Sequence, residues 1–182
     1  MGSWDLPTSA EINGREFEVN TDFRAVLDVI SVMSDPELGG DEKGYVALNV
    51  FYPDFEDMRR ADYEDAAAFM NWFVDGGQEQ NRASKARLMD WEQDFALISA
   101  PVNRVLGFEC RTCEYLHWWT FLAAYMEIGD CLFANVVSCR KKKAQGRMDK
   151  SDRDFYRRNK KLVDFKVKTT EVERQAVSEW IG

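Results

Sequence analysis

The sequence predicts a mainly α-helical protein, a small helical bundle that carries a short N-terminal β-hairpin. Three observations predict this class. Apolar residues recur every three or four positions over most of the chain, one short stretch near the N-terminus alternates instead, and glycines separate the periodic segments. The chain has 182 residues, of which 45% are hydrophobic and 31% charged, and this suits one compact domain.

The hairpin is predicted over residues 9–20. Asn13-Gly14 favours the positive φ angles of a type I′ turn, whose twist matches that of two paired strands. After the turn, Phe17 and Val19 alternate with glutamates, which is the period of a half-buried strand. Because a two-stranded hairpin is marginally stable alone, we expect it to pack on other elements.

Helices are predicted to follow the hairpin. Thr21 is typical of an N-cap, and the helix that it starts should end before Pro36. Residues 44–52 are mostly apolar but too few for the period to distinguish a short helix from a strand. A further helix over residues 62–74 is predicted to stop at Gly76-Gly77.

Composition divides the chain into residues 1–75, a polar linker-like loop over residues 76–86, and a C-terminal helical part over residues 87–182. The charge is also uneven. Residues 1–100 contain 8 Lys and Arg against 21 Asp and Glu, a net charge of −13, whereas residues 101–182 contain 16 against 11, a net charge of +5. This asymmetry favours self-association or a partner chosen by charge, and it argues against a general nucleic-acid-binding domain, which is usually basic throughout.

The second half is predicted to run helix after helix. The helices span Asp90–Leu106, Glu114–Asp130, Cys131 to about Lys142, Asp149 or Ser151 to about Phe165, and a short last segment up to Gly182. Pro101 is expected to kink or break the first of them, because proline lacks an amide donor and its ring clashes with the preceding turn. Asp130 is expected to cap the third.

Aromatic residues concentrate in Glu114–Asp130, which we call the aromatic segment. A rotation of about 100° per residue spreads its large side chains over an arc of roughly 220°. The remaining stripe is expected to face solvent and holds His117, Thr120, Ala124 and Glu127. The segment should therefore fill a core on most sides, and the edges of Trp118, Phe121 and Tyr125 are candidates to hold a partner.

Cys110, Cys113 and His117 are spaced as in some metal sites. Structural zinc requires four converging ligands, and the sequence has no second Cys-x-x-Cys or His pair. We therefore expect ordinary reduced cysteines and no bound metal, and a small metal-binding protein remains the alternative. With one histidine, no nucleophile signature and no phosphate-binding glycine loop, we expect no catalytic residues, no cofactor and no enzymatic activity.

The sequence also indicates where the protein acts. No apolar run approaches the roughly 17–25 residues of a membrane span. The first residues lack the pattern of a signal peptide, so we expect a cytoplasmic protein without a membrane partner. Without a secretory signal, the four cysteines are not expected to form disulfides.

A basic segment ends one predicted helix and continues along the next. Arg140, Lys141 and Lys142 lie at a helix C-terminus, where the dipole favours each cation by about 0.3–1 kcal/mol. Arg157 and Arg158 lie outside the apolar seam of the following helix. These five residues are candidates for binding an acidic protein surface, such as the first half of a second copy. A solvated face and a nucleic-acid contact are the alternatives.

The order of short motifs along the chain is more informative than any one of them. The motifs are Pro7-Thr8-x-x-Glu11-Ile12-Asn13-Gly14, Asn20-Thr21-Asp22-Phe23-Arg24, Asp94-Phe95-x-x-Ile98, Leu116-His117-Trp118-Trp119-x-Phe121, Arg140-Lys141-Lys142 and Arg158-Asn159. This order resembles the bacteriophage gp-fifteen family of long-tailed phages and prophages of Gram-positive bacteria, over roughly residues 7–165. The Leu-His-Trp-Trp-x-Phe block is its most specific part, whereas Pro101, Cys110 and Cys113 are not features of the family.

The resemblance implies a gene between the major tail protein and the tape measure protein. Products from that position resemble tail assembly chaperones, which bind the tape measure protein, help tail tube subunits polymerise around it, and are absent from the finished virion. Such chaperones are largely helical and tend to self-associate. The resemblance thus implies a non-enzymatic chaperone in the host cytoplasm, with a metal-binding protein or a nucleic-acid-binding phage regulator as alternatives.

Overall fold

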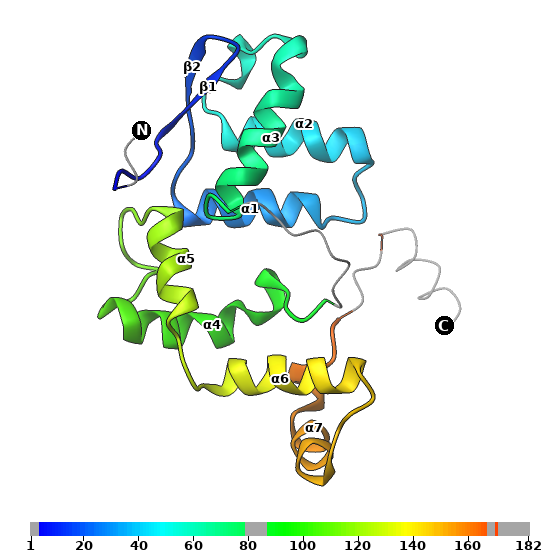
Figure 1. Ribbon diagram of the computed structural model, residues 1–182. Helices are drawn as coiled ribbons and strands as arrows, with labels where there is room; N and C mark the ends of the chain where they lie inside the picture. Colours follow the sequence, from blue (N-terminus) through cyan, green and yellow to red (C-terminus); the bar gives the residue numbers. More distant parts are fainter. Residues whose placement is uncertain (1–3, 79–86, 167–169, 171–182) are drawn as a thin grey trace. The chain divides into compact units, whose positions relative to one another are not determined.

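The computed structural model describes residues 4–78, 87–166 and 170. Within these residues it contains seven α-helices and one two-stranded antiparallel hairpin, so the predicted mainly α class is confirmed (Figure 1). The chain divides into two compact units. Among the described residues, unit 1 comprises 4–78, His117–Trp119 and 170, and unit 2 comprises 87–116 and Thr120–Lys166.

Unit 1 begins with the predicted hairpin. Strand β1 (Ser9–Ile12) pairs with β2 (Arg15–Glu18), and Ala10 lies opposite Phe17. Asn13 and Gly14 have φ angles of 51° and 75°, as the type I′ turn requires, so this prediction is confirmed. The hairpin buries its apolar face against α3, which gives it the packing that two strands need.

Three helices complete unit 1. They are α1 (Phe23–Met33), α2 (Gly40–Phe51) and α3 (Tyr63–Val74), with the short 3-10 helices η1 (Phe55–Asp57) and η2 (Arg60–Asp62) between the last two. Residues 44–52, for which the sequence allows a helix or a strand, are helical except for the last residue. Helix α2 packs on both α1 and α3, and the rings of Phe51 and Phe73 meet in the core with centroids 5.3 Å apart.

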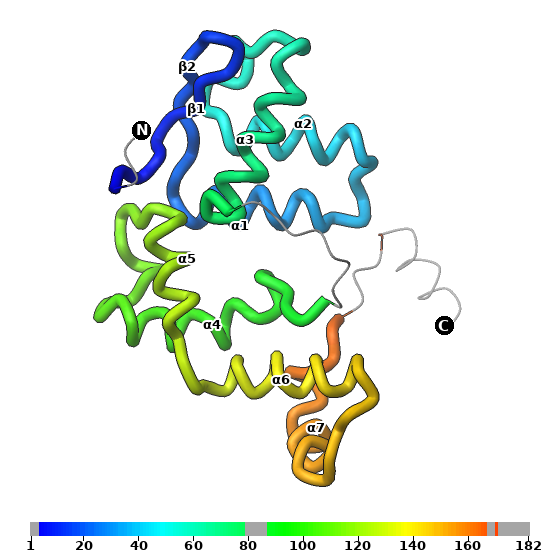
Figure 2. Tube along the Cα trace, viewed as in Figure 1, coloured from blue at the N-terminus to red at the C-terminus, as the bar shows by residue number. Residues whose placement is uncertain are grey.

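Unit 2 is built around α4 (Trp91–Leu106), α6 (Leu132–Ala144) and α7 (Lys150–Val163), and α4 and α6 lie side by side (Figure 2). The sequence predicts that Pro101 kinks or breaks the first of these helices. Helix α4 continues through Pro101 without a break. Proline removes one amide donor from a helix, and here its ring is buried, so packing offsets part of the loss. The helix ends at Gly107, whose φ of 79° is the left-handed conformation of a glycine C-cap.

The aromatic segment forms a shorter helix than predicted. Helix α5 spans Trp118–Met126, and residues 115 and 116 have no helical structure. The predicted rotation of about 100° per residue therefore does not apply to the residues before Trp118. His117 and Ala124 are buried, with 4% and 5% of their surface exposed, so the predicted solvent stripe is wrong at both positions. His117 is instead extended and forms an isolated β-bridge with Asp22.

Two predicted N-caps are each displaced by one residue. Helix α1 is capped by Asp22 rather than Thr21, since the Asp22 carboxylate accepts a hydrogen bond from the Arg24 amide at 2.9 Å. Helix α6 is capped by Cys131 rather than Asp130, and the Cys131 sulfur accepts from the amide of Ala134. Asp149, one of the two predicted caps of α7, is its N-cap.

A second apolar cluster joins α6 and α7. Val136, Cys139 and Val163 form its buried centre, and Leu97, Met148, Phe155, Tyr156 and Leu162 pack around them. The inward seam predicted for the last basic helix is thereby confirmed. The predicted final helix up to Gly182 and residues 79–86 of the linker-like loop lie outside the described residues. Across the described ranges, no helix is both long and apolar enough to cross a membrane.

Candidate partner-binding surfaces

Trp118 and Trp119 are anchoring residues in unit 1. The indole Nε1 of Trp118 donates to the carbonyl of Val74, and that of Trp119 donates to the carbonyl of Phe73, each at 2.9 Å. Carbonyls in the last turn of a helix have no partner within the helix, so the two indoles satisfy the end of α3. Trp118 is 1% exposed, and this candidate for partner binding therefore lies inside unit 1.

His117 closes the start of α5 as an N-cap. Its Nδ1 accepts a hydrogen bond from the amide of Trp119, and its Nε2 lies 3.0 Å from the carbonyl of Pro7. Because Nδ1 accepts, the ring proton belongs on Nε2, which then donates to Pro7. The imidazole thus replaces the side-chain oxygen that usually caps a helix. Both ring nitrogens therefore have structural partners.

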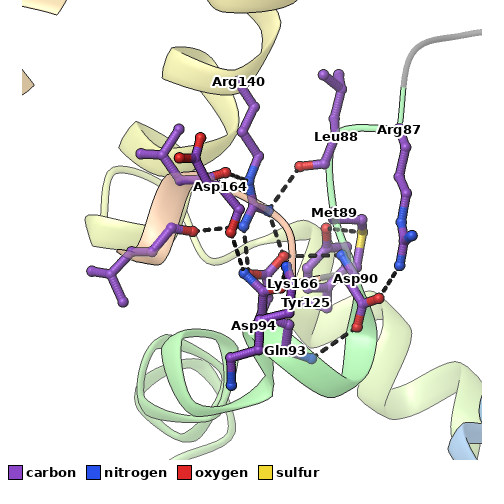
Figure 3. Close-up of polar contacts among 12 residues, drawn as sticks. Arg87, Leu88, Met89, Asp90, Gln93, Asp94, Tyr125, Arg140, Asp164 and Lys166 are labelled. Carbon is purple, nitrogen blue, oxygen red and sulfur yellow. Dashed lines mark hydrogen bonds and ion pairs between the residues drawn. The ribbon is translucent and has the colours of Figure 1, made fainter. Parts of the chain in front are cut away.

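Arg140 lies in a buried clamp within unit 2 (Figure 3). It pairs with Asp94 through two hydrogen bonds, from Nη1 at 2.6 Å and Nη2 at 2.9 Å. Its three remaining donors go to the carbonyls of Val163, Leu162 and Leu88 at 2.8, 2.7 and 3.1 Å. All five guanidinium N–H groups are used, and Arg140 is 4% exposed, so it is not displayed to a partner.

The clamp extends to the residues that follow α7. Gln93 donates through Nε2 to the carbonyl of Asp164 at 2.9 Å and accepts through Oε1 from the amide of Lys166 at 2.8 Å. The guanidinium carbons of Arg140 and Arg87 both lie over the ring of Phe165, at 4.1 Å and 4.9 Å from its centroid. The start of α4, the C-terminal part of α6 and the exit from α7 are therefore fixed at one point.

The other basic candidates have different surroundings. Lys142 pairs with Asp152 of α7 at 2.6 Å, and this hydrogen bond lowers the pKa of the Asp152 carboxyl and raises that of the lysine. Lys141 and Arg158 are exposed. Arg157 is also exposed, with 76% of its side chain accessible, and pairs with Asp154 on the surface. Lys141, Arg157 and Arg158 therefore remain accessible.

Phe121 and Tyr125 lie on the buried side of α5 in unit 2. Phe121 is fully buried, and its ring stacks on Phe95 with centroids 6.3 Å apart. Tyr125 is half-buried against Trp91, and its hydroxyl lies 3.2 Å from the sulfur of Met89. These two candidates therefore form part of the core and its edge, and only Tyr125 reaches solvent.

A shallow apolar groove lies between α4 and the start of α6. It has a volume of about 310 Å³ and is lined by Ala96, Leu97, Ala100, Pro101, Arg104, Cys131 and Leu132. The alanines and Leu132 are exposed, while Arg104 donates to the carbonyl of Ile128. Small side chains let another backbone approach closely, so this groove has the character of a helix-binding surface. We call it the α4–α6 groove.

Unit 2 exposes large apolar side chains around the same elements. Val105, Phe108, Tyr115, Met126 and Leu132 are 42–58% exposed and lie between the end of α4 and the start of α6. Tyr115 and Met126 belong to the arc that the predicted rotation placed in the core, so the prediction is wrong at these two positions. Phe108 and Tyr115 lie in the irregular stretch between α4 and α5, where side chains follow no helical face.

The cysteines do not form a recognisable ligand set. Cys110 is buried, and the thiol of the half-buried Cys113 donates to the Cys110 carbonyl at 3.0 Å. Burial raises the pKa of the Cys110 thiol, which disfavours the thiolate that metals bind. In the part of the chain that the structure describes, no group of three or more His, Cys, Asp or Glu residues is placed to hold a metal ion.

Comparisons with known proteins agree with the order of motifs. The family described as Bacteriophage Gp15 protein matches residues 4–165, which include both units and the aromatic segment. Searches of curated proteins and of solved structures each found no match. Since the matched region covers most of the 182 residues, the chain belongs to the bacteriophage Gp15 protein family.

Proposed function

We propose that this protein is a non-enzymatic tail assembly chaperone that acts in the host cytoplasm. It binds the tape measure protein, assists polymerisation of the major tail protein into the tube, and leaves before the virion is complete. The observation that carries the proposal is membership of the Gp15 family over residues 4–165. The resemblance to that family implies a gene placed between those of the two partners.

The α4–α6 groove supports a specific mode of binding. A long helical partner needs a surface that accepts an apolar stripe and lets its backbone come close. Ala96 and Ala100 provide the close approach, and Leu97, Pro101 and Leu132 provide the apolar lining. The aromatic residues of α5 then act as support, because Trp118 and Phe121 are buried, and the exposed Met126 adds contact area.

Co-expression with the tape measure protein tests this binding mode. The wild-type chain is expected to keep the tape measure protein in the soluble fraction. A variant with Ala96→Glu and Ala100→Glu places two carboxylates in the groove and is expected to lose most of this effect. Ala144→Glu introduces the same residue at an exposed position at the end of α6, outside the groove, and should behave as wild type. If the double variant protects as well as wild type does, the groove is not the binding site.

A further inference from the structure

A second groove lies on unit 1 between α2 and α3. Its volume is about 770 Å³, and its lining includes Gly40, Gly44, Tyr45 and Tyr63. The rings of Tyr45 and Tyr63 each lie 5.1 Å from the ring of the buried Phe55, which fixes both tyrosines in place. Tyr45 is 54% exposed, so the groove presents a supported aromatic surface to solvent. We call it the α2–α3 groove.

The α2–α3 groove is acidic. Asp41, Glu42 and Glu64 line it together with one cation, Arg60. Neither Asp41 nor Glu64 forms an ion pair with any described residue. The surroundings have the same sign, since residues 4–78 contain 5 Lys and Arg against 17 Asp and Glu, a net charge of −12. Charge complementarity therefore favours a cationic occupant.

Helix α7 carries a surface of the matching kind. Lys150, Arg153 and Arg157 are all exposed and are spaced at i, i+3 and i+7, which places them within about 60° on one helix face. The apolar side chains of α7 face the opposite way, into the cluster with Val136. We call the three cations the α7 basic stripe. A partner can therefore contact the α7 basic stripe without displacing the apolar side chains of α7 from the core of unit 2.

We propose that the α2–α3 groove of one copy binds the α7 basic stripe of a second copy. The guanidinium groups of Arg153 and Arg157 lie over the tyrosine rings as cation–π partners, and their charges meet the carboxylates of Asp41 and Glu64. Glycines at positions 40 and 44 leave room for the helix to approach. This contact deepens the self-association expected of the proposed chaperone and does not require tape measure binding.

The geometry of this contact predicts how assembly grows. The groove and the stripe are different surfaces, so the interface is heterologous, and each added copy leaves one free groove and one free stripe. Assembly then continues until it closes into a ring or extends as a helix. Because the attraction acts between exposed charges, it is expected to weaken steeply as ionic strength rises.

Sedimentation velocity of the purified full chain tests the proposal with two variants. Asp41→Lys with Glu64→Lys disables the groove, and Arg153→Glu with Arg157→Glu disables the stripe. Each variant is expected to weaken self-association at least tenfold and to sediment as a monomer at concentrations where wild type forms larger species. Asp28→Lys, a single charge reversal at an exposed position on α1, should sediment as wild type.

Mixing the two variants separates a docking contact from a general charge effect. The groove variant keeps an intact stripe and the stripe variant keeps an intact groove, so an equimolar mixture should associate although neither variant does so alone. A chain with all four substitutions should associate again, because the charges are exchanged. A wild-type chain that stays monomeric at every concentration and salt would overturn the proposal, and so would a mixture that stays monomeric.

Discussion

At the scale of single residues, Arg140 shows why burial and charge must be considered together. A buried ion pair adds little net stability when the attraction between its charges only offsets the cost of removing them from water. Removing one partner, however, leaves an unpaired charge inside the protein. Arg140 uses its five donors on Asp94 and three carbonyls, a geometry that lysine cannot reproduce. The residue therefore holds together the packing of unit 2.

Arg140→Ala is expected to destabilise the protein by about 3–5 kcal/mol, because Asp94 is left buried without a counter-ion. Lys141→Ala, at the exposed neighbouring position, should change stability by less than about 0.5 kcal/mol. Arg140→Met combined with Asp94→Leu should cost less than Arg140→Ala alone, since no charge stays buried. Urea unfolding measures all three, and equal midpoints for the variants at 140 and 141 would contradict the clamp.

His117→Ala is expected to cost about 2 kcal/mol or more, because the N-cap of α5 and the bond to the Pro7 carbonyl are both lost. His117→Asn keeps a side-chain oxygen that can accept from the Trp119 amide, so it should recover about 1 kcal/mol. Thermal unfolding of the two variants separates the contribution of the capping bond to Trp119 from that of the bond to the Pro7 carbonyl. If asparagine is no better than alanine, His117 is not the cap of α5.

At the scale of elements, local signals predicted what local interactions determine. The hairpin follows from Asn13-Gly14, and the start of α7 follows from Asp149, since both depend on neighbours within four residues. The start of α5 depends instead on the amide of Trp118, which donates to the carbonyl of Thr21 at 2.7 Å from 97 positions away. No periodicity within the aromatic segment contains that information.

The candidate sites differ in the same way. The sequence correctly placed Arg140 near the end of a helix. The carboxylate that pairs with it, that of Asp94, lies 46 residues earlier in the chain. Both residues lie in motif blocks of the family, so the pairing of blocks was the available signal. The two grooves have no sequence signal, because each arises where separate helices meet and leave small side chains between them.

Gly77→Ala tests the contact between the end of α3 and Trp119. A Cβ at this position would lie 2.8 Å from Cη2 of Trp119, and the φ of 77° adds backbone strain. Gly14→Ala is a matched control, with a φ of 75° and no atom within 4 Å of the added carbon. We expect Gly77→Ala to cost about 1–2 kcal/mol more than Gly14→Ala in chemical unfolding. Equal losses would mean that Trp119 moves aside freely.

The pairing of α6 with α7 predicts sensitivity to acid. Hydrogen bonds from Lys142 and Lys143 lower the pKa values of Asp152 and Asp164. A carboxylate with a lowered pKa in the folded state contributes stability above its unfolded pKa of about 3.9, and this contribution is lost as pH falls through the folded value. Melting temperature should therefore drop more steeply below about pH 4 for wild type than for Asp152→Asn with Asp164→Asn. Parallel curves would contradict the pairing.

At the scale of the whole molecule, the two units have opposite charge and separate surfaces. Residues 4–78 carry a net charge of −12, and residues 87–166 carry 15 Lys and Arg against 11 Asp and Glu, a net charge of +4. The α4–α6 groove suits an apolar helix, and the α2–α3 groove suits a basic one. In the function that we propose, one chain holds a client and associates with its own copies through different elements.

The most direct test of this account is the fraction of tape measure protein that stays soluble in cells, measured with and without this chain at equal expression. We predict that most of the tape measure protein is soluble with the chain and most is insoluble without it. The soluble tape measure protein should co-purify with the chain. An equal soluble fraction in the two cases would contradict the proposed function.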